Sequence, residues 1–299
     1  MRNSNESSTT VSVIIVTYNS ASCIRECVIS VLAQTDTAAE IIVVDNASAD
    51  DTANVVRSFG GDVNLIANRD NIGFGRGCNQ GFAASHGRFI YFLNPDARLV
   101  ERDDLAQLGR ALQAHPQWGL AATRVVSVEG QDESTPATTY PGQARARNDF
   151  DRLPGKIAWV IGASLFVRRE VFTALGGFDP DFFIYSEETD LCLRLRKLGH
   201  EIGLVAGVTV RHIGAVSEAG RDPYDTWTRK LNGLHLFWKK HYAPEDAARL
   251  VRRDLWRARV RMILNGVMAA FQPPRSRAWE KYRRYRAIRD ASVKFLSAK

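Results

Sequence analysis

The stretch VSVIIVTYNS, residues 11–20, decides the fold of this chain. Its first seven residues form an almost continuous apolar, β-branched run, which is typical of a strand buried on both faces in a parallel sheet. The run EIIVVDN at residues 40–46 has the same character. Because a helical pattern over residues 21–33 separates the two runs, together they predict a right-handed βαβ unit.

The rest of the chain extends this pattern and then changes it. Two more apolar runs predict a third and a fourth strand, at residues 63–68 and 88–94. The pattern therefore predicts an α/β fold with a Rossmann-like, mostly parallel sheet flanked by helices and a C-terminal helical extension. The remaining predicted segments are a long loop at 127–156, a strand at 159–167, a helix at 186–198, β segments at 201–206 and 209–212, and helices from 223 onward.

Composition excludes several classes of protein. The 299 residues are 45% hydrophobic and 24% charged, which is globular composition. The four cysteines include no C-x-x-C pair, so we expect buried, reduced thiols rather than a disulfide scaffold or a thiolate zinc site. Residues 1–10 are polar, carry no secretory signal and are predicted to be disordered, while the apolar stretch at 262–271 is too short to span a bilayer. We therefore expect a cytoplasmic protein.

Charge is distributed unevenly along the chain. Residues 249–299 hold 15 Lys and Arg against 3 Asp and Glu, so this segment carries +12 while the remaining residues carry −5 of the formal net charge of +7. Such asymmetry predicts a mildly acidic body and a basic tail that meets something anionic.

An apolar stripe runs along this basic tail at helical spacing. Next to the stripe lies a row of arginines, Arg253, Arg257 and Arg261. An amphipathic basic helix of this kind either docks on an anionic membrane surface, here the inner face of the cell membrane, or packs on protein, including a second subunit. The stripe residues are Trp256, Val260, Ile263, Val267 and Phe271.

Polar residues follow the predicted strands where each of them ends. Thr17 and its neighbours end the first strand, Asp45 ends the second, and Asn94-Pro95-Asp96 follows the fourth. Ligands of open α/β sheets bind at the carboxyl ends of the strands, so these residues predict a small-molecule site. Asp96 is placed to hold Mg²⁺ together with diphosphate oxygens, although a carboxylate after proline is also a common turn residue.

The glycine-rich stretch at residues 71–81, NIGFGRGCNQG, does not complete a dinucleotide fingerprint. It follows the third strand rather than the first, and the chain holds no P-loop either. The glycines predict positive φ angles or close backbone approach, in a strand-to-helix turn or beside a ligand.

Three carboxylates, those of Glu187, Glu188 and Asp190, stand at the start of the predicted helix 186–198. They can compensate the helix dipole, or one of them can act as a base beside the aromatic segment that precedes them. His212 closes a β segment, where a histidine is either a packed residue or a metal ligand.

Five of these segments together resemble the family 2 glycosyltransferases of GT-A fold, closest to the rhamnosyltransferase-like branch of bacterial surface-polysaccharide synthesis. The resemblance covers residues 11–215, and implies a catalytic domain at 11–221 followed by a basic helical region at 222–299. It also implies inverting transfer of a sugar from a nucleotide-sugar donor to a hydroxyl of a glycan or lipid-linked acceptor, with Mg²⁺ or Mn²⁺. The segments are VSVIIVTYNS, IIVVDNASADDT, NRDNIGFGRGCNQG, FLNPDARL and GGFDPDFFIYSEETDLCLRLRKLGHEI.

The same resemblance assigns roles to individual residues. Asp96, in the place of the family's Asp-x-Asp motif, and His212 would hold the metal; the first acid of that motif is Asn94 here. Glu188 stands where the family carries its catalytic base, with Glu187 and Asp190 as rivals. Asp45 would bind the pyrimidine base of the nucleotide-sugar. The residues implied for the nucleotide-sugar as a whole are Thr17, Tyr18, Asn19, Asp45, Asn71, Gly73, Asn94 and Asp96.

Two other functions compete with this one. The favoured donor is dTDP-rhamnose, and the alternative within the class is a UDP-hexose. From a different class, the segment WEKYRRYRAIR at 279–289 interleaves aromatic residues with arginine, as in nucleic-acid-binding proteins. That hypothesis leaves the polar strand ends unexplained, so we expect no nucleic-acid partner.

Overall fold

The computed structural model describes residues 11–127, 129–134, 136–214, 222–273 and 276–298. The predicted disorder of residues 1–10 thus concerns residues outside the described part. The chain forms two compact units. Unit 1 comprises Met1–Thr139, Leu153–Phe183 and Glu187–Ser217, and unit 2 comprises Tyr140–Arg152, Ile184–Ser186 and Glu218–Lys299.

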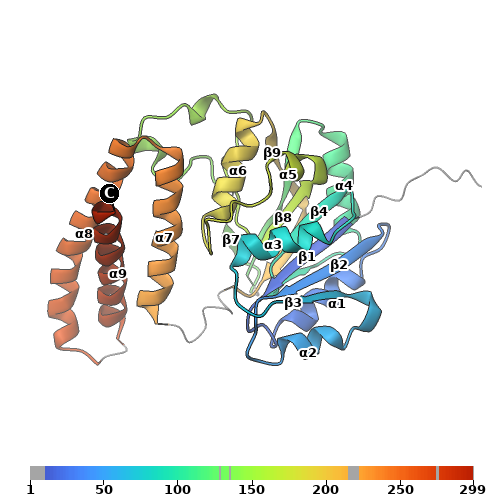
Figure 1. Cartoon of the computed structure of the whole chain (residues 1–299), viewed down its shortest axis with the longest axis horizontal. Coiled ribbons are helices and arrows are strands. Elements are labelled where there is room, and N and C mark those ends of the chain that lie inside the picture. Colours follow the sequence, from blue (N-terminus) through green and yellow to red (C-terminus); the bar gives the residue numbers. More distant parts are fainter. Residues whose placement is uncertain (1–10, 128, 135, 215–221, 274–275, 299) are drawn as a thin grey trace, which may run out of the picture. The chain divides into compact units, whose positions relative to one another are not determined.

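Unit 1 is an α/β structure whose described residues contain one sheet of nine strands (Figure 1). The order across the sheet is β3-β2-β1-β4-β8-β6-β9-β5, and β7 pairs with β6. The strands are β1 Val11–Thr17, β2 Ala39–Asp45, β3 Asn64–Ala67, β4 Phe89–Leu93, β5 Ala97–Leu99, β6 Trp118–Val126, β7 Asp132–Ser134, β8 Ser164–Arg168 and β9 Glu201–His212.

The four strands predicted from the apolar runs pair in parallel, as the βαβ pattern requires. The second half of the sheet is less regular, since β8 runs antiparallel to both β4 and β6. β8 begins at Ser164 and not at residue 159, because Trp159 forms only an isolated bridge to Ala137. The two predicted β segments at 201–206 and 209–212 form one strand, β9, whose pairing with β6 shifts register after Thr123.

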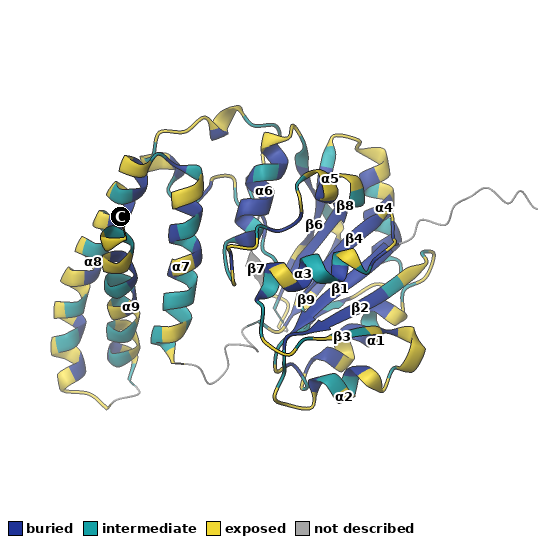
Figure 2. Cartoon of the chain, viewed as in Figure 1, coloured by how far each residue is buried: buried dark blue, intermediate teal, exposed yellow. Residues whose placement is uncertain are grey.

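Both faces of the sheet are covered, as Figure 2 shows by the dark blue strands between helices. Along β1, Val13 and Ile15 belong to one apolar cluster, while Ile14 and Val16 belong to the other. The first cluster includes side chains of α1, α2 and α4, and the second includes side chains of α3, α5 and α6. These helices are α1 Ile24–Leu32, α2 Thr52–Arg57, α3 Phe74–Ala83, α4 Asp104–Ala114, α5 Arg169–Ala174 and α6 Glu187–Lys197.

The glycines of the 71–81 stretch allow α3 to lie close to β1. A Cβ atom at Gly77 would lie 2.9 Å from Val16 Cγ1, and one at Gly81 would lie 2.5 Å from Ile14 Cγ2. The predicted close backbone approach is therefore confirmed at these two positions, where it serves helix–sheet packing.

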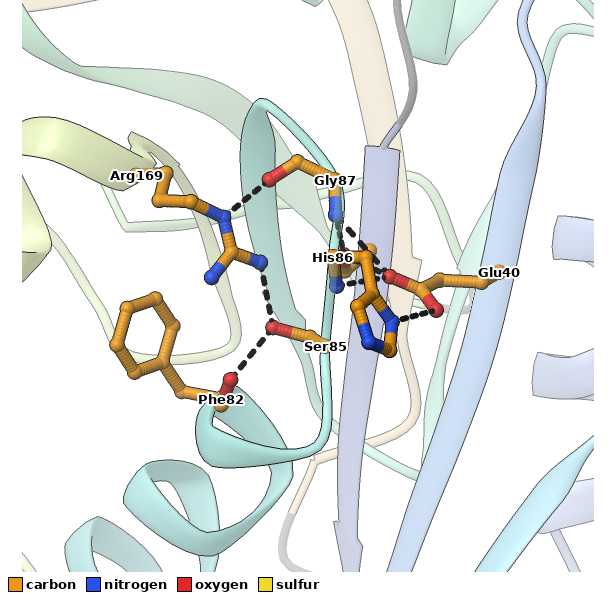
Figure 3. A network of polar contacts seen from close by, with 7 residues as sticks. Glu40, Phe82, Ser85, His86, Gly87 and Arg169 are labelled. Carbon is orange, nitrogen blue, oxygen red and sulfur yellow. Dashed lines mark hydrogen bonds and ion pairs between the residues drawn. The ribbon is translucent and has the colours of Figure 1, made fainter.

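A polar network fixes the start of the central strands (Figure 3). Glu40 Oε1 accepts hydrogen bonds from the Ser12 hydroxyl, from His86 N and from Gly87 N at 2.5, 2.5 and 3.1 Å. Arg169 donates to the Gly87 carbonyl and, at 2.7 Å, to the Ser85 hydroxyl. Burial raises the pKa of the Glu40 carboxyl, but the hydrogen bonds outweigh burial and the net shift is downward. The polar groups of this network at the amino end of the sheet therefore pair with one another.

Unit 2 is helical, as predicted for the residues from 223 onward. Its helices are α7 Pro223–His241, α8 Pro244–Ala270 and α9 Arg277–Ser297, of which α9 packs against both others (Figure 1). A segment far away in sequence completes it, since the Trp238 indole and the Tyr242 hydroxyl both donate to the Pro141 carbonyl at 3.0 Å. Asp246, fully buried at the start of α8, accepts from Arg147 N at 2.8 Å. The predicted loop 127–156 is therefore partly an ordered component of unit 2.

Two composition-based expectations can be compared with the structure. Cys23, Cys27, Cys78 and Cys192 are free and buried, as predicted. In the described part of the chain, no helix combines the length and the apolar character needed to cross a membrane.

Candidate functional site

The carboxyl ends of β1 and β2 meet, because Thr17 and Asp45 are register partners. The Thr17 hydroxyl donates to Asp45 Oδ1 at 2.8 Å, and Ser48 N donates to Asp45 Oδ2 at 3.1 Å. Asp45 is only 3% exposed. Its carboxylate therefore has a fixed orientation at the end of the sheet. Ser48, which the sequence analysis did not single out, contributes to this orientation from the loop after β2.

The residues that follow β1 form the next part of the site. Asn19 has a φ of 52°, a left-handed conformation that asparagine tolerates better than most residues. Its backbone N–H donates to the Ser48 hydroxyl at 2.8 Å, and its side-chain oxygen accepts from Ala49 N at 2.7 Å. Tyr18 is half-buried beside it. The turn after β1 is thereby tied to the loop after β2.

Asn71 and Gly73 begin the turn into α3. The Asn71 side-chain oxygen accepts from Gly73 N at 3.0 Å, while Asn46 donates to the Gly73 carbonyl at 3.1 Å. Gly73 has a φ of 90°, and a Cβ there would collide with the Phe183 carbonyl. The site needs glycine at this position for both reasons. Asn68, which pairs with Asn46 at 3.0 Å, holds the turn from the end of β3.

Asp96 and His212 come together at the same end of the sheet, where β5 begins and β9 ends. His212 Nε2 lies 3.2 Å from Asp96 Oδ1, and the two side chains are 10% and 9% exposed, respectively. Asn94 Nδ2 lies 3.4 Å from the same histidine nitrogen. Strand pairing produces this meeting, since β5 runs antiparallel to β9 with Ala97 opposite His212, and Ile213 N donates to the Asp96 carbonyl at 2.9 Å.

The donor set of this pair fits a divalent cation. Carboxylate oxygen and imidazole nitrogen are both ligands of Mn²⁺, and carboxylate oxygen is preferred by Mg²⁺. Two ligands about 2.1 Å from one octahedral ion lie about 3 Å apart, close to the separation of Asp96 Oδ1 and His212 Nε2. Among the described residues, no group of three or more His, Cys, Asp and Glu side chains converges as a metal site. A pair suits Mg²⁺ or Mn²⁺ bound together with phosphate oxygens.

The three acids at the start of α6 have different environments. Asp190 is 1% exposed and pairs with Arg194 at 2.7 Å. Glu187 is 5% exposed, and its Oε2 has no hydrogen-bond partner among the described residues. Burial raises the pKa of the Glu187 carboxyl well above its usual range, and the charge of Glu188 raises it further. Glu188 is the half-exposed member of the three.

Glu188 also lies near the strand end that carries Asp96. A Cβ added to Gly162 would lie 3.5 Å from Glu188 Cβ, so this side chain covers the Gly162 backbone. The next residue, Ala163, accepts a hydrogen bond from Asn94 N at 3.0 Å. Gly162, which sequence reasoning missed, therefore joins α6 to the end of β4. Its only signal in the sequence is a glycine inside the strand predicted at 159–167.

Comparisons with known proteins show the family and the fold of this chain. Residues 12–176 match the model of the family described as glycosyl transferase family 2. The N-acetylglucosaminyl-diphospho-decaprenol L-rhamnosyltransferase of Mycobacterium tuberculosis is 25% identical over 290 residues, covering 86% of this chain and 90% of that protein. The O-antigen chain rhamnosyltransferase WbaN of Salmonella anatum is 25% identical over 193 residues, covering 60% of this chain and 58% of that protein.

Solved structures show the same fold. The mannosyltransferase PcManGT from Pyrobaculum calidifontis, in complex with GDP-Man and Mn²⁺, superposes with a TM-score of 0.60 at 20% identity. The likeness covers 97% of this chain and 87% of that one. The family model spans more than half of the chain and includes the carboxyl ends of β1, β2 and β4. The chain therefore belongs to glycosyl transferase family 2 and has the GT-A fold.

Proposed function

We propose that this chain catalyses the inverting transfer of a sugar from a nucleotide-sugar to a hydroxyl of a glycan or lipid-linked acceptor. One observation carries the proposal: Glu188 and the Asp96–His212 pair lie at one end of the sheet, joined through Gly162 and the Ala163–Asn94 hydrogen bond. Glycosyl transfer needs a base for the acceptor and charge neutralisation for the departing diphosphate. This arrangement offers groups for both.

Asp96 and His212 are the residues proposed to hold Mg²⁺ or Mn²⁺. When bound, such an ion stabilises the negative charge that develops on the leaving diphosphate. The low exposure of both side chains favours this role, since bulk water then competes little with them for the ion. His212 takes part as neutral imidazole, the form that ligates metals.

Glu188 is the proposed base that removes the proton of the acceptor hydroxyl. Its half-exposed carboxylate can reach a substrate, whereas the burial of Glu187 and the Arg194 partner of Asp190 disfavour its two rivals. The carboxylate of Glu188 is also close enough to the buried acid of Glu187 for its charge to raise the pKa of Glu187.

The nucleotide is proposed to lie along the carboxyl ends of β1, β2 and β3. Asp45 would accept a hydrogen bond from the pyrimidine base, in an orientation that Thr17 and Ser48 fix. Gly73 would border the nucleotide from the turn that Asn46 and Asn71 hold. The other proposed contacts are Tyr18, Asn19, Asn71 and Asn94.

For the donor we propose dTDP-rhamnose, because two curated relatives are named as rhamnosyltransferases. A UDP-hexose is the alternative, supported by a hexosyltransferase of Haloferax volcanii that is 26% identical over 211 residues. The decaprenol diphosphate in the name of the mycobacterial relative supports a lipid-linked acceptor.

A donor screen tests the proposal. The full chain is incubated with Mn²⁺ and each of dTDP-rhamnose, UDP-glucose, UDP-galactose and GDP-mannose, and thermal stabilisation and release of the nucleoside diphosphate are measured. We expect one pyrimidine donor to raise the melting temperature and to be hydrolysed slowly, and excess chelator to suppress hydrolysis. Neither stabilisation nor hydrolysis with any donor would contradict the proposal, and hydrolysis that persists in excess chelator would contradict the metal role.

A further inference from the structure

The outward side of α8 carries an exposed apolar surface that the proposed transfer does not use. Its exposed fractions reach 66% at Trp256, 70% at Ile263 and 86% at Phe271, the residue that follows the helix. We call this surface the α8 face. Its members are Trp256, Val260, Ile263, Leu264, Val267, Met268 and Phe271.

The α8 face is separate from the side on which α8 packs within unit 2. At 3.6 residues per turn, Val251, Ala258 and Ala269 lie on the opposite side of the helix, and all three are buried. The helix therefore has two apolar sides, of which one is covered. Exposed large apolar residues occur singly on most proteins, whereas seven on one side of one helix form a patch that indicates an interaction surface.

Arginines border the α8 face on both sides. By helical spacing, Arg257 and Arg261 flank one side, and Arg252 and Arg259 flank the other, and all four are exposed. Between residues 249 and 271 the sequence holds one acid, Asp254, which is half-buried. A partner that covers the α8 face must therefore be apolar at its centre and anionic around it.

We propose that the α8 face binds the surface of an anionic lipid bilayer, with the helix axis parallel to the membrane. Trp256 and Phe271, about 22 Å apart at 1.5 Å per residue, would anchor the two ends of the stripe among the lipid headgroups. The flanking arginines would meet anionic headgroups. A second copy of the chain fits less well, because a dimer on this face would bring two arginine-bordered surfaces together with one half-buried acid per copy to compensate.

Vesicle flotation of the full chain tests the proposal without any transfer assay, so its outcome is independent of the proposed function. We use vesicles of phosphatidylcholine alone and vesicles that also contain phosphatidylglycerol. We expect flotation with the anionic vesicles at about 0.1 M salt and release at about 1 M, where the Debye length falls from about 10 Å to about 3 Å. A chain that stays unbound from anionic vesicles at low salt overturns the proposal.

An apolar triple variant tests the face itself. Ile263→Ser, Val267→Ser and Phe271→Ser combined should weaken binding to anionic vesicles by at least about a hundredfold, because apolar burial contributes to interfacial affinity. The matched control replaces three exposed apolar residues of unit 1, Ile29, Leu198 and Leu204, by serine, and should bind as the unmodified chain does. Equal losses in the two triple variants, or no loss in the α8 variant, would contradict the assignment.

A charge variant tests the border. Arg257→Gln with Arg261→Gln should weaken binding about 30-fold, since each arginine near the surface contributes about fivefold. The control removes two exposed arginines of unit 1, Arg57 and Arg102, in the same way and should change binding little. If instead the unmodified chain is a dimer without vesicles and the apolar triple variant is a monomer, the face belongs to a second copy and the membrane proposal is wrong.

Discussion

The carboxyl end of the sheet in unit 1 and the α8 face in unit 2 are built in opposite ways. At the sheet end, Asp45 is 3% exposed and accepts hydrogen bonds from Thr17 and Ser48, and the Asp96 side chain is 9% exposed beside His212. On the α8 face, exposed fractions run from 39% at Val260 to 86% at Phe271, and α8 with the residue that follows it supplies the whole face. The first arrangement fixes single atoms, and the second only collects similar side chains.

This difference predicts how each surface responds to substitution. Where a reaction depends on individual atoms in fixed positions, one replacement removes most of the function. Where the binding free energy is a sum of similar contributions, each replacement removes one contribution. The losses of free energy then add, so the fold-changes in affinity multiply. The sheet end should therefore respond in an all-or-none manner, and the α8 face in a graded manner.

Asp96→Ala should give the largest single effect. We expect sugar transfer to fall about a thousandfold or more, because metal stabilisation of the diphosphate charge contributes several kcal/mol. The fold should persist, since the hydrogen bond that pairs this residue with Ile213 uses the Asp96 backbone carbonyl. Activity and circular dichroism are compared with Asp62→Ala, an exposed acid of the same unit. An active Asp96→Ala protein would contradict the all-or-none response that we expect at the sheet end.

Glu188→Gln should lower turnover about 10²- to 10⁴-fold while donor affinity changes little, because the proposed base acts on the acceptor. The control is Glu170→Gln, whose side chain is 75% exposed. Combining Glu188→Gln with Asp96→Ala should cost little beyond the worse single change, since both act on one reaction. Multiplying effects would mean that the two residues act independently, against the all-or-none description.

The effects of substitutions on the α8 face on vesicle binding should multiply. Trp256→Ala and Phe271→Ala should each weaken binding to anionic vesicles about tenfold, and their combination about a hundredfold, because they lie more than 10 Å apart and share no partner on the helix. Vesicle titration of the two single variants and the double variant measures this. A double variant no weaker than either single one would show a cooperative site rather than a graded surface.

The sequence predicted the sheet end better than the elements around it. The apolar runs placed β1 to β4 within one residue of their bounds, because strands buried on both faces leave a continuous signal. Strand β6 and the antiparallel placement of β8 were missed, since their neighbours are set by pairing across the fold and not by local pattern. His212 and Asp96 stand 116 positions apart, so no local pattern shows their contact; the resemblance implied that they meet, and the β5–β9 pairing brings them together.

The candidate site shows the same division. The resemblance favoured Glu188 among the acids at 187, 188 and 190, but the local pattern could not rank them, because their spacing is the same whichever one is buried. The structure separates them through the Arg194 ion pair, the burial of Glu187 and the contact of Glu188 with Gly162. The α8 face, by contrast, was visible in the sequence, since helical periodicity alone collects its residues. What remained hidden was which apolar side of the helix is covered.

Gly81→Ala should destabilise unit 1 without touching either surface. A Cβ at this position would lie 2.5 Å from Ile14, a clash that forces α3 and β1 apart and costs about 1–3 kcal/mol. The control, Gly61→Ala, has nothing within 4 Å of the added atom and should be nearly neutral. Denaturant unfolding measures both. Equal stability of the two variants would contradict the predicted clash between α3 and β1.

The smallest expected effect concerns the interior of unit 2. His235 is 4% exposed, packs beside Trp238 and Phe295, and its Nε2 has no hydrogen-bond partner among the described residues. Burial lowers the pKa of this imidazole from its ordinary 6.5 to about 4. Between these two values the unfolded chain binds a proton that the folded chain does not.

The sign of the pH effect follows from this difference. Above pH 6.5 both states are neutral at His235 and the group adds no pH dependence, whereas below it the free energy of unfolding falls until pH reaches about 4. At pH 5.5 the loss should be about 1 kcal/mol. Unfolding by denaturant, followed by tryptophan fluorescence from pH 7 to pH 5, measures it in the unmodified chain and in His235→Phe. The substitution should flatten the profile, because other titrating groups contribute equally to both proteins, and parallel profiles would show that His235 is accessible to protons in the folded state.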